Sequence, residues 1–100
     1  MSRKIKKSDY IKISRSLIKK LYKLGCWGKG SLYEVELKDG FPSEEKGKII
    51  IIADSLVKQK ILCKKPKKYG FKYYLNTERI DKIKEIIREK RRSSLLLVLF

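Results

Sequence analysis

The sequence predicts an α+β fold with three helices, a two-stranded β-hairpin and a closing helix. Three observations support this prediction. Residues 8–24 repeat apolar side chains with the period of a helix. Residues 61–75 contain two β-prone runs on either side of a turn signal, and the residues after Asn76 return to helical spacing. A chain of 100 residues that is 42% hydrophobic can bury one small core, so we expect a single domain.

The first helix is predicted over residues 8–24, with Ser8 as its N-cap. Its apolar stripe consists of Tyr10, Ile13, Leu17, Leu21 and Leu24. Lysine and arginine occupy the other side, as in an amphipathic surface helix. Glycines at positions 25, 28 and 30 end the helix, and Trp27 between them is expected to cover the core.

Two further helices are expected before the hairpin. Ser31 and Glu34 have the spacing of a capping box, which predicts a short helix from Ser31 to about residue 40. Ser43 is the expected N-cap of the third helix, with two glutamates in its first turn. The isoleucines at 49–52 are also compatible with a buried strand. The i, i+3, i+4, i+7 spacing over more than ten residues favours a helix to about Gln59.

The last part of the prediction is the hairpin and the helix that follows it. Residues 61–65 and 71–75 are the two strands, and residues 66–70 form a five-residue turn. Asn76 is the expected N-cap of the last helix. Acidic residues in its first turn and basic residues near its end agree with the helix dipole.

The charge of the chain predicts a binding protein. Lysine and arginine number 27 against 11 acidic residues, which gives a net charge of +16, and there is no histidine. The missing histidine removes Ser-His and Cys-His catalysis as well as His-containing zinc sites. We therefore expect no enzyme activity, no cofactor and no metal. Nucleic acid is the expected partner of such a charge, and an anionic membrane surface is the second choice.

The positive charge is concentrated on particular segments. Residues 1–20 carry eight basic residues and one acid, and residues 61–70 carry four lysines and no acid. Residues 31–45 reverse this balance, with five acids and one lysine. Lysines outnumber arginines by 21 to 6, which favours phosphate contacts over base reading, although an AT-rich genome would also favour lysine and isoleucine.

Residues 52–62, the charged hairpin and the exit at Tyr73–Asn76 resemble the recognition helix, wing and exit of small archaeal and bacterial winged helix-turn-helix regulators. The resemblance covers about residues 8–90. It implies a third helix in the major groove of DNA, a second helix that braces it, and a wing on a neighbouring phosphate strand or in the minor groove. It also divides the chain into a basic arm (1–7), a winged-helix domain (8–76) and a C-terminal helix with an apolar tail (77–100).

The resemblance implies DNA contacts from the third helix and the wing. They are Ser43, Lys46, Lys48, Lys58, Lys64, Lys65, Lys67, Lys68, Tyr69 and Lys72. Arg3, Lys4, Lys6 and Lys7 are interpreted either as an arm that reaches the DNA backbone or as a frayed terminus. Two residues depart from the family pattern: Asp54 lies on the outward face of the third helix, and Lys60 stands where a glycine is common.

These observations favour a transcriptional regulator that grips double-stranded DNA mainly through phosphates. The alternatives are an RNA- or ribosome-associated basic protein and a winged helix used for protein contacts. No apolar segment of signal-peptide type follows the basic N-terminus, so we expect a cytoplasmic, nucleoid-associated protein. Cys26 and Cys63 are expected to be reduced because they have no ligand-like spacing.

A homodimer is expected from the apolar surface near the C-terminus. Its predicted interface consists of Ile80, Ile83, Ile87, Leu95, Leu97 and Phe100. The run at 95–100 has six apolar residues, far fewer than the roughly 20 needed to cross a bilayer. It is expected to bury itself in a subunit interface or across the domain's own core, and contact with a membrane surface is a weaker alternative.

Overall fold

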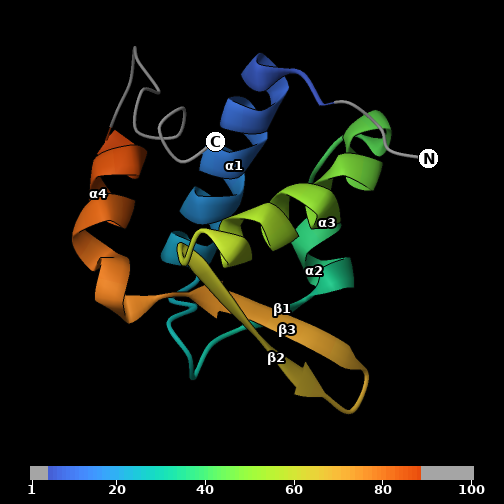
Figure 1. Cartoon of the computed structure of the whole chain (residues 1–100). Helices are drawn as coiled ribbons and strands as arrows, with labels where there is room; N and C mark the ends of the chain where they lie inside the picture. Colours follow the sequence, from blue (N-terminus) through green and yellow to red (C-terminus); the bar gives the residue numbers. More distant parts are fainter. Residues whose placement is uncertain (1–4, 89–100) are drawn as a thin grey trace.

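The structure is a computed structural model that describes residues 5–88, and this part of the chain has an α+β fold. The elements follow in the order α1 (Lys7–Lys23), β1 (Leu32–Tyr33), α2 (Glu34–Lys38), α3 (Ser43–Lys58), β2 (Leu62–Lys67), β3 (Gly70–Leu75), the 3₁₀ turn η1 (Thr77–Arg79) and α4 (Ile80–Arg88). The strands form an antiparallel sheet in the order β1-β3-β2. Helices α1 and α3 cover one face of this sheet, and α4 lies beside α1 (Figure 1).

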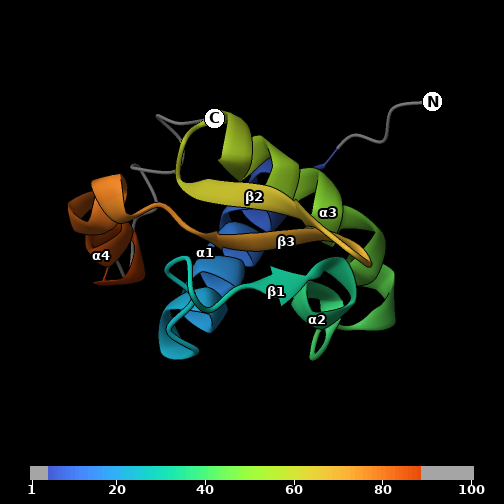
Figure 2. The same cartoon turned by 90° about the horizontal axis from the view of Figure 1, so that it is seen from below.

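The hairpin is tighter than the sequence predicts. Lys67 pairs with Gly70, so the turn contains only Lys68 and Tyr69, and the predicted five-residue turn is wrong. Pro66 belongs to β2, where it pairs with Phe71. Strand β2 lies at the edge of the sheet, and an edge strand tolerates a residue that lacks the N–H donor of a ladder. The turn lies on the same side of the molecule as α2 (Figures 1 and 2).

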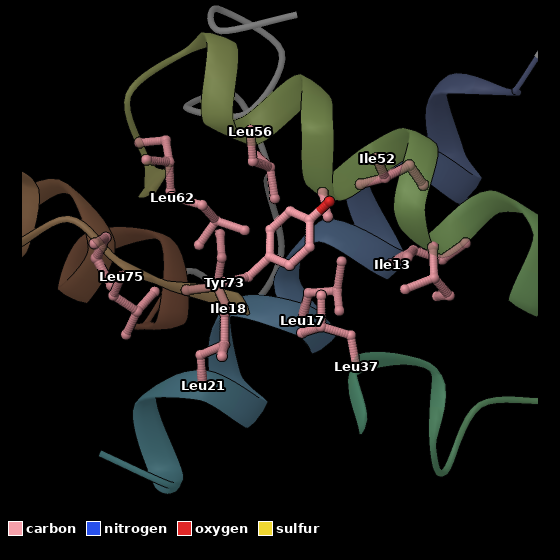
Figure 3. Close-up of a cluster of buried hydrophobic side chains, with 14 of the residues drawn as sticks. Ile13, Leu17, Ile18, Leu21, Leu37, Ile52, Leu56, Leu62, Tyr73 and Leu75 are labelled. Carbon is pink, nitrogen blue, oxygen red and sulfur yellow. The ribbon is translucent and has the colours of Figure 1, made fainter. Parts of the chain in front are cut away.

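The core lies between α1, α3 and the sheet (Figure 3). Among residues 5–88, Tyr73 of β3 is the largest side chain that is fully buried, and its ring lies among aliphatic side chains from both helices. Figure 3 labels Ile13, Leu17, Ile18, Leu21, Leu37, Ile52, Leu56, Leu62 and Leu75 around it. Cys26 is buried in the same core, and Trp27 packs against this core as predicted. Neither Cys26 nor Cys63 forms a disulfide.

Three predicted helix starts are wrong. Ser8 lies inside the first turn of α1, and Ser43 is the first residue of α3, with no side-chain cap on either helix. Ser31 precedes β1, and α2 begins only at Glu34. The Glu36 carboxylate accepts from the Tyr33 N–H at 2.8 Å, so the acidic half of the cap lies two residues later than predicted. Pairing of β1 with β3 takes residues 32–33 out of the helix.

Helices α1 and α3 end in the same way, with a residue in the left-handed region after the cap. In α1 this residue is Gly25, with φ of 68°, and in α3 it is Lys60, with φ of 69°. The next N–H, of Cys26 or Ile61, bonds to the carbonyl five residues earlier at 2.9 or 3.0 Å. This pattern is a Schellman motif, whose left-handed position favours glycine. Lys60 therefore ends α3 in the same way as Gly25 ends α1.

Helix α4 packs three of its four isoleucines, Ile83, Ile86 and Ile87, against the domain itself. The Asn76 side chain accepts from the Glu78 N–H at 3.0 Å, which confirms Asn76 as the N-cap of this helical segment. Ile83 is fully buried in the core, so it cannot lie on the dimer surface predicted for it. Ile87 is half-buried against the same core, whereas Ile80 is exposed.

The remaining residues of the predicted interface, Leu95, Leu97 and Phe100, lie outside the described residues. Within residues 5–88, no helix has the length and apolar character needed to cross a membrane.

Candidate nucleic-acid interface

Five lysines of the β2–β3 hairpin form the candidate interface. They are Lys64, Lys65, Lys67, Lys68 and Lys72, called the hairpin lysines below. Because side chains alternate along a strand, Lys64 shares the core side of the sheet with its partner Tyr73, while Lys65 and its partner Lys72 lie on the opposite side. The predicted lysine cluster is therefore divided between the two faces of the hairpin.

Four of the hairpin lysines lie over aromatic rings. The distance from Nζ to the ring centroid is 4.6 Å for Lys64 and Phe71, and 4.7 Å for Lys72 and Tyr33. Lys65 lies 5.1 Å from the ring of Tyr74, and Lys68 lies 5.7 Å from the ring of Tyr69. An aromatic face attracts a cation through its quadrupole, by about 0.5–1 kcal/mol at exposed sites. Such a contact orients the lysine and leaves its full charge in place.

The hairpin lysines differ in their polar partners. Lys65 donates to the Gly28 carbonyl oxygen at 2.8 Å, which ties β2 to the loop after α1. Lys67 is exposed and has no ion pair or side-chain hydrogen bond with residues 5–88. Lys68 and Lys72 contact rings but likewise have no ion pair or side-chain hydrogen bond with residues 5–88. The ammonium groups of Lys67, Lys68 and Lys72 can therefore bind an external anion.

Asp54 joins α3 to the hairpin. Its Oδ1 accepts from the Tyr73 hydroxyl at 2.8 Å and from Lys64 Nζ at 3.2 Å. Burial raises the pKa of Tyr73 well above its ordinary value, and the hydrogen bond to Asp54 raises it further. The carboxylate that the sequence places on the outward face thus has two partners, and it fixes the base of the hairpin against the helix.

The rest of the outward face of α3 is sparse in charge. Lys46 and Lys58 are exposed, and neither has an ion pair with residues 5–88. Ile51 lies between them with 48% of its surface exposed. Ser43 is exposed at the first position of the helix. These side chains offer few groups that can read base edges.

Lys48 and Lys7 occupy different places from those predicted. Lys48 Nζ lies 3.3 Å from Asp9 Oδ2 of α1, so this lysine is used in an ion pair at the α1–α3 contact. Lys7 is the first residue of α1, so the predicted arm does not extend to residue 7. Lys6 is exposed just before the helix, and Arg3 and Lys4 lie outside the described residues.

A cleft at the hairpin turn was not predicted from the sequence. It has a volume of about 170 Å³ and is lined by Tyr33, Glu34, Val35, Tyr69, Gly70 and Phe71. The rings of Tyr33 and Tyr69 meet edge to face, with centroids 6.4 Å apart. The β1–β3 pairing and the tight turn bring these residues together from distant parts of the sequence. The six residues are called the aromatic cleft below.

Comparison of the chain with protein-family models, curated proteins and solved structures found no match. Within residues 5–88, no group of three or more acidic or cysteine side chains could hold a metal ion.

Proposed function

We propose that this chain is a winged-helix protein that binds double-stranded DNA mainly through phosphate contacts and acts as a transcriptional regulator. The order of three helices and a hairpin, with the hairpin joined to a short strand before α2, agrees with this fold. In a winged helix the third helix and the hairpin after it contact the DNA. Asp54 and Lys64 link these two elements here, at 3.2 Å.

The observation that carries the proposal is the state of the hairpin lysines. Four of them are oriented by aromatic rings, which supply no negative charge. Across the tip, Lys67, Lys68 and Lys72 have no acidic partner among residues 5–88. A phosphate strand would supply the missing anions and release its condensed counterions, which drives binding.

The outward face of α3 supports modest sequence preference. Its centre has exposed Ile51 and the engaged carboxylate of Asp54, and it has no arginine, asparagine or glutamine. Bidentate contacts from such side chains are the usual means of reading guanine and adenine. We therefore expect duplexes of unrelated sequence to bind with similar affinities.

Fluorescence anisotropy on a labelled duplex tests the proposal. The logarithm of the binding constant should fall linearly with the logarithm of salt concentration, with a slope of about −0.9 for each phosphate contacted. A flat salt response, or no binding at low salt, would contradict it. Competition with a structured RNA at equal salt discriminates the alternative of an RNA- or ribosome-associated protein, which requires the RNA to displace the duplex.

A further inference from the structure

We propose that the aromatic cleft binds one unpaired nucleobase, with guanine preferred, from a strand held by the surrounding lysines. The proposal rests on the proposed function, because it requires that the chain bind nucleic acid. It adds a second site that recognises a base outside the double helix. Three features of the cleft support it: its rings, its lysines and its carboxylate.

The rings of the cleft present aromatic surface to solvent. Tyr69 is 76% exposed and Phe71 is 42% exposed, although both belong to or adjoin the sheet. Val35 of α2, at 76% exposure, forms an apolar wall beside them. Every nucleobase has a flat π-face that stacks on such rings, which makes exposed aromatic side chains a common platform for single strands.

Lysines determine the charge of the ligand that this cleft can accept. Lys72 and Lys68 lie over the rings of Tyr33 and Tyr69, whereas Lys64 is on the other face of the hairpin and is paired with Asp54. Two ammonium groups beside the rings repel a cationic ligand, although an aromatic cage with a carboxylate would otherwise suit a quaternary ammonium. The same two groups attract the phosphates on either side of a base. Charge complementarity therefore favours a nucleic-acid strand.

Glu34 gives the cleft a means of choosing among bases. Glu34 is one of the residues that line the cleft, and its carboxylate has no ion pair or side-chain hydrogen bond with residues 5–88. An ionised carboxylate only accepts hydrogen bonds, and its two oxygens suit two parallel donors. Guanine presents two such donors, N1–H and N2–H, on its Watson–Crick edge, and each other base presents fewer. A base pair uses these donors, so the site requires an unpaired guanine.

The experiment compares labelled single strands of roughly 12 thymidines, with or without one central guanine, and a duplex. For the wild-type protein the guanine should raise the affinity about tenfold. The Y69A variant should lose at least about fivefold more affinity for the guanine strand than for the duplex, because the duplex is held mainly by lysine charges that the variant keeps. Tyr22, an exposed tyrosine of α1 outside the cleft, supplies the control variant Y22A, which should change neither affinity.

The E34Q variant tests the carboxylate. It should reduce the guanine preference to less than about threefold without lowering the affinity for the thymidine strand, because an amide offers one acceptor in place of two and carries no negative charge that repels phosphates. The control E85Q, at an exposed position of α4, should keep the preference. Circular dichroism of each variant shows that the fold is retained.

The outcomes separate this site from the proposed function. Equal affinity of wild-type protein for the two single strands, or equal loss of single-strand and duplex binding in Y69A, would overturn the cleft while leaving duplex binding intact. Absence of any binding at low salt would overturn the proposed function and the cleft together. Guanine-dependent binding without duplex binding would support the cleft and overturn the duplex proposal.

Discussion

The lysines of the helices and the lysines of the hairpin have different partners. Lys12 and Lys48 lie within 3.6 and 3.3 Å of carboxylates, and Lys20 donates to the carbonyl oxygens of Glu36 and Asp39 at 2.6 Å each. In the hairpin, Lys64 and Lys65 also have polar partners, but Lys67, Lys68 and Lys72 have none among residues 5–88, and Lys68 and Lys72 lie over aromatic rings. Carboxylates cancel charge and carbonyls occupy donors, whereas a ring does neither completely. The net charge of +16 therefore does not show which lysines can bind an external anion, because that depends on the partners of each lysine in the fold.

Removing the hairpin charge should have the largest effect. In the variant K64A/K65A/K67A/K68A, the affinity for duplex DNA at low salt should fall about 100-fold, and the salt slope should become shallower by about 3. Each lysine that contacts a phosphate displaces a counterion condensed on the DNA, so removing the lysine removes both the contact and the counterion release. Anisotropy titrations at several salt concentrations measure both quantities.

The control removes the same charge from elsewhere. It is the variant K19A/K23A/K29A/K84A, whose four lysines are exposed on α1, the following loop and α4. Its affinity should fall less than about fivefold, because screening weakens distant charges at ordinary salt. Equal losses in the two variants would show that total charge, and not the hairpin, determines binding.

Lys20 is a lysine whose ammonium group stabilises the fold and does not bind an external anion. Its Nζ satisfies carbonyl groups at the C-terminal end of α2, a helix of only five residues. The K20M variant keeps the aliphatic stem and should lower the free energy of unfolding by about 1–2 kcal/mol, with duplex affinity within about twofold. Urea denaturation measures the loss. K19M, at the neighbouring exposed position, should leave the free energy of unfolding nearly unchanged. An equal loss in K19M would argue against a stabilising contact between Lys20 and the end of α2.

The junction of the two regions is tested by Tyr73. Its pKa is raised in the folded protein by burial and by donation to Asp54, so the folded state holds the phenolic proton more tightly than the unfolded state. The stabilisation is present below the ordinary tyrosine pKa of about 10 and is lost as the pH rises above it. Y73F should cost about 1 kcal/mol near neutral pH.

The difference in unfolding free energy between wild type and Y73F should shrink as the pH rises above about 10. Urea titrations at a series of alkaline pH values measure it. Since both proteins share the titrating lysines, the comparison isolates residue 73. Y22F, at an exposed tyrosine, should show no such trend. A difference that stays constant with pH would contradict the role given to the Tyr73 hydroxyl.

Small effects of opposite sign are expected at the two helix ends. K60G should raise the free energy of unfolding by about 0.5 kcal/mol. Glycine removes the strain of a Cβ in the left-handed region, and the greater entropy that glycine loses on folding offsets only part of this gain. G25A should lower it by about 1 kcal/mol. No atom lies within 4 Å of a Cβ at position 25, so conformation alone accounts for that loss. Changes of the same sign in both variants would contradict the shared motif.

The sequence predicted the elements whose signals are local. The stripe of α1 and the i, i+3, i+4, i+7 spacing of α3 identified these helices, and the turn signal located the hairpin. The cap at Ser31 was wrong because pairing of β1 with β3 takes residues 32–33 out of the helix, and those at Ser8 and Ser43 were wrong because α1 and α3 begin without a side-chain cap. The two-residue turn also depended on register, since β2 extends through Pro66 when every residue finds a partner on β3.

The same distinction between local and tertiary information applies to the candidate site. By itself, the sequence determined that the positive charge lies on particular segments, because charge is counted residue by residue. Only the tertiary structure decided which charges remain available. Lys48 met Asp9 of α1, Asp54 met Tyr73 and Lys64, and Tyr33 met Tyr69 at the hairpin turn. Such partners are distant in sequence, and the strength of charge and ring contacts depends on separations of a few ångströms that only folding fixes.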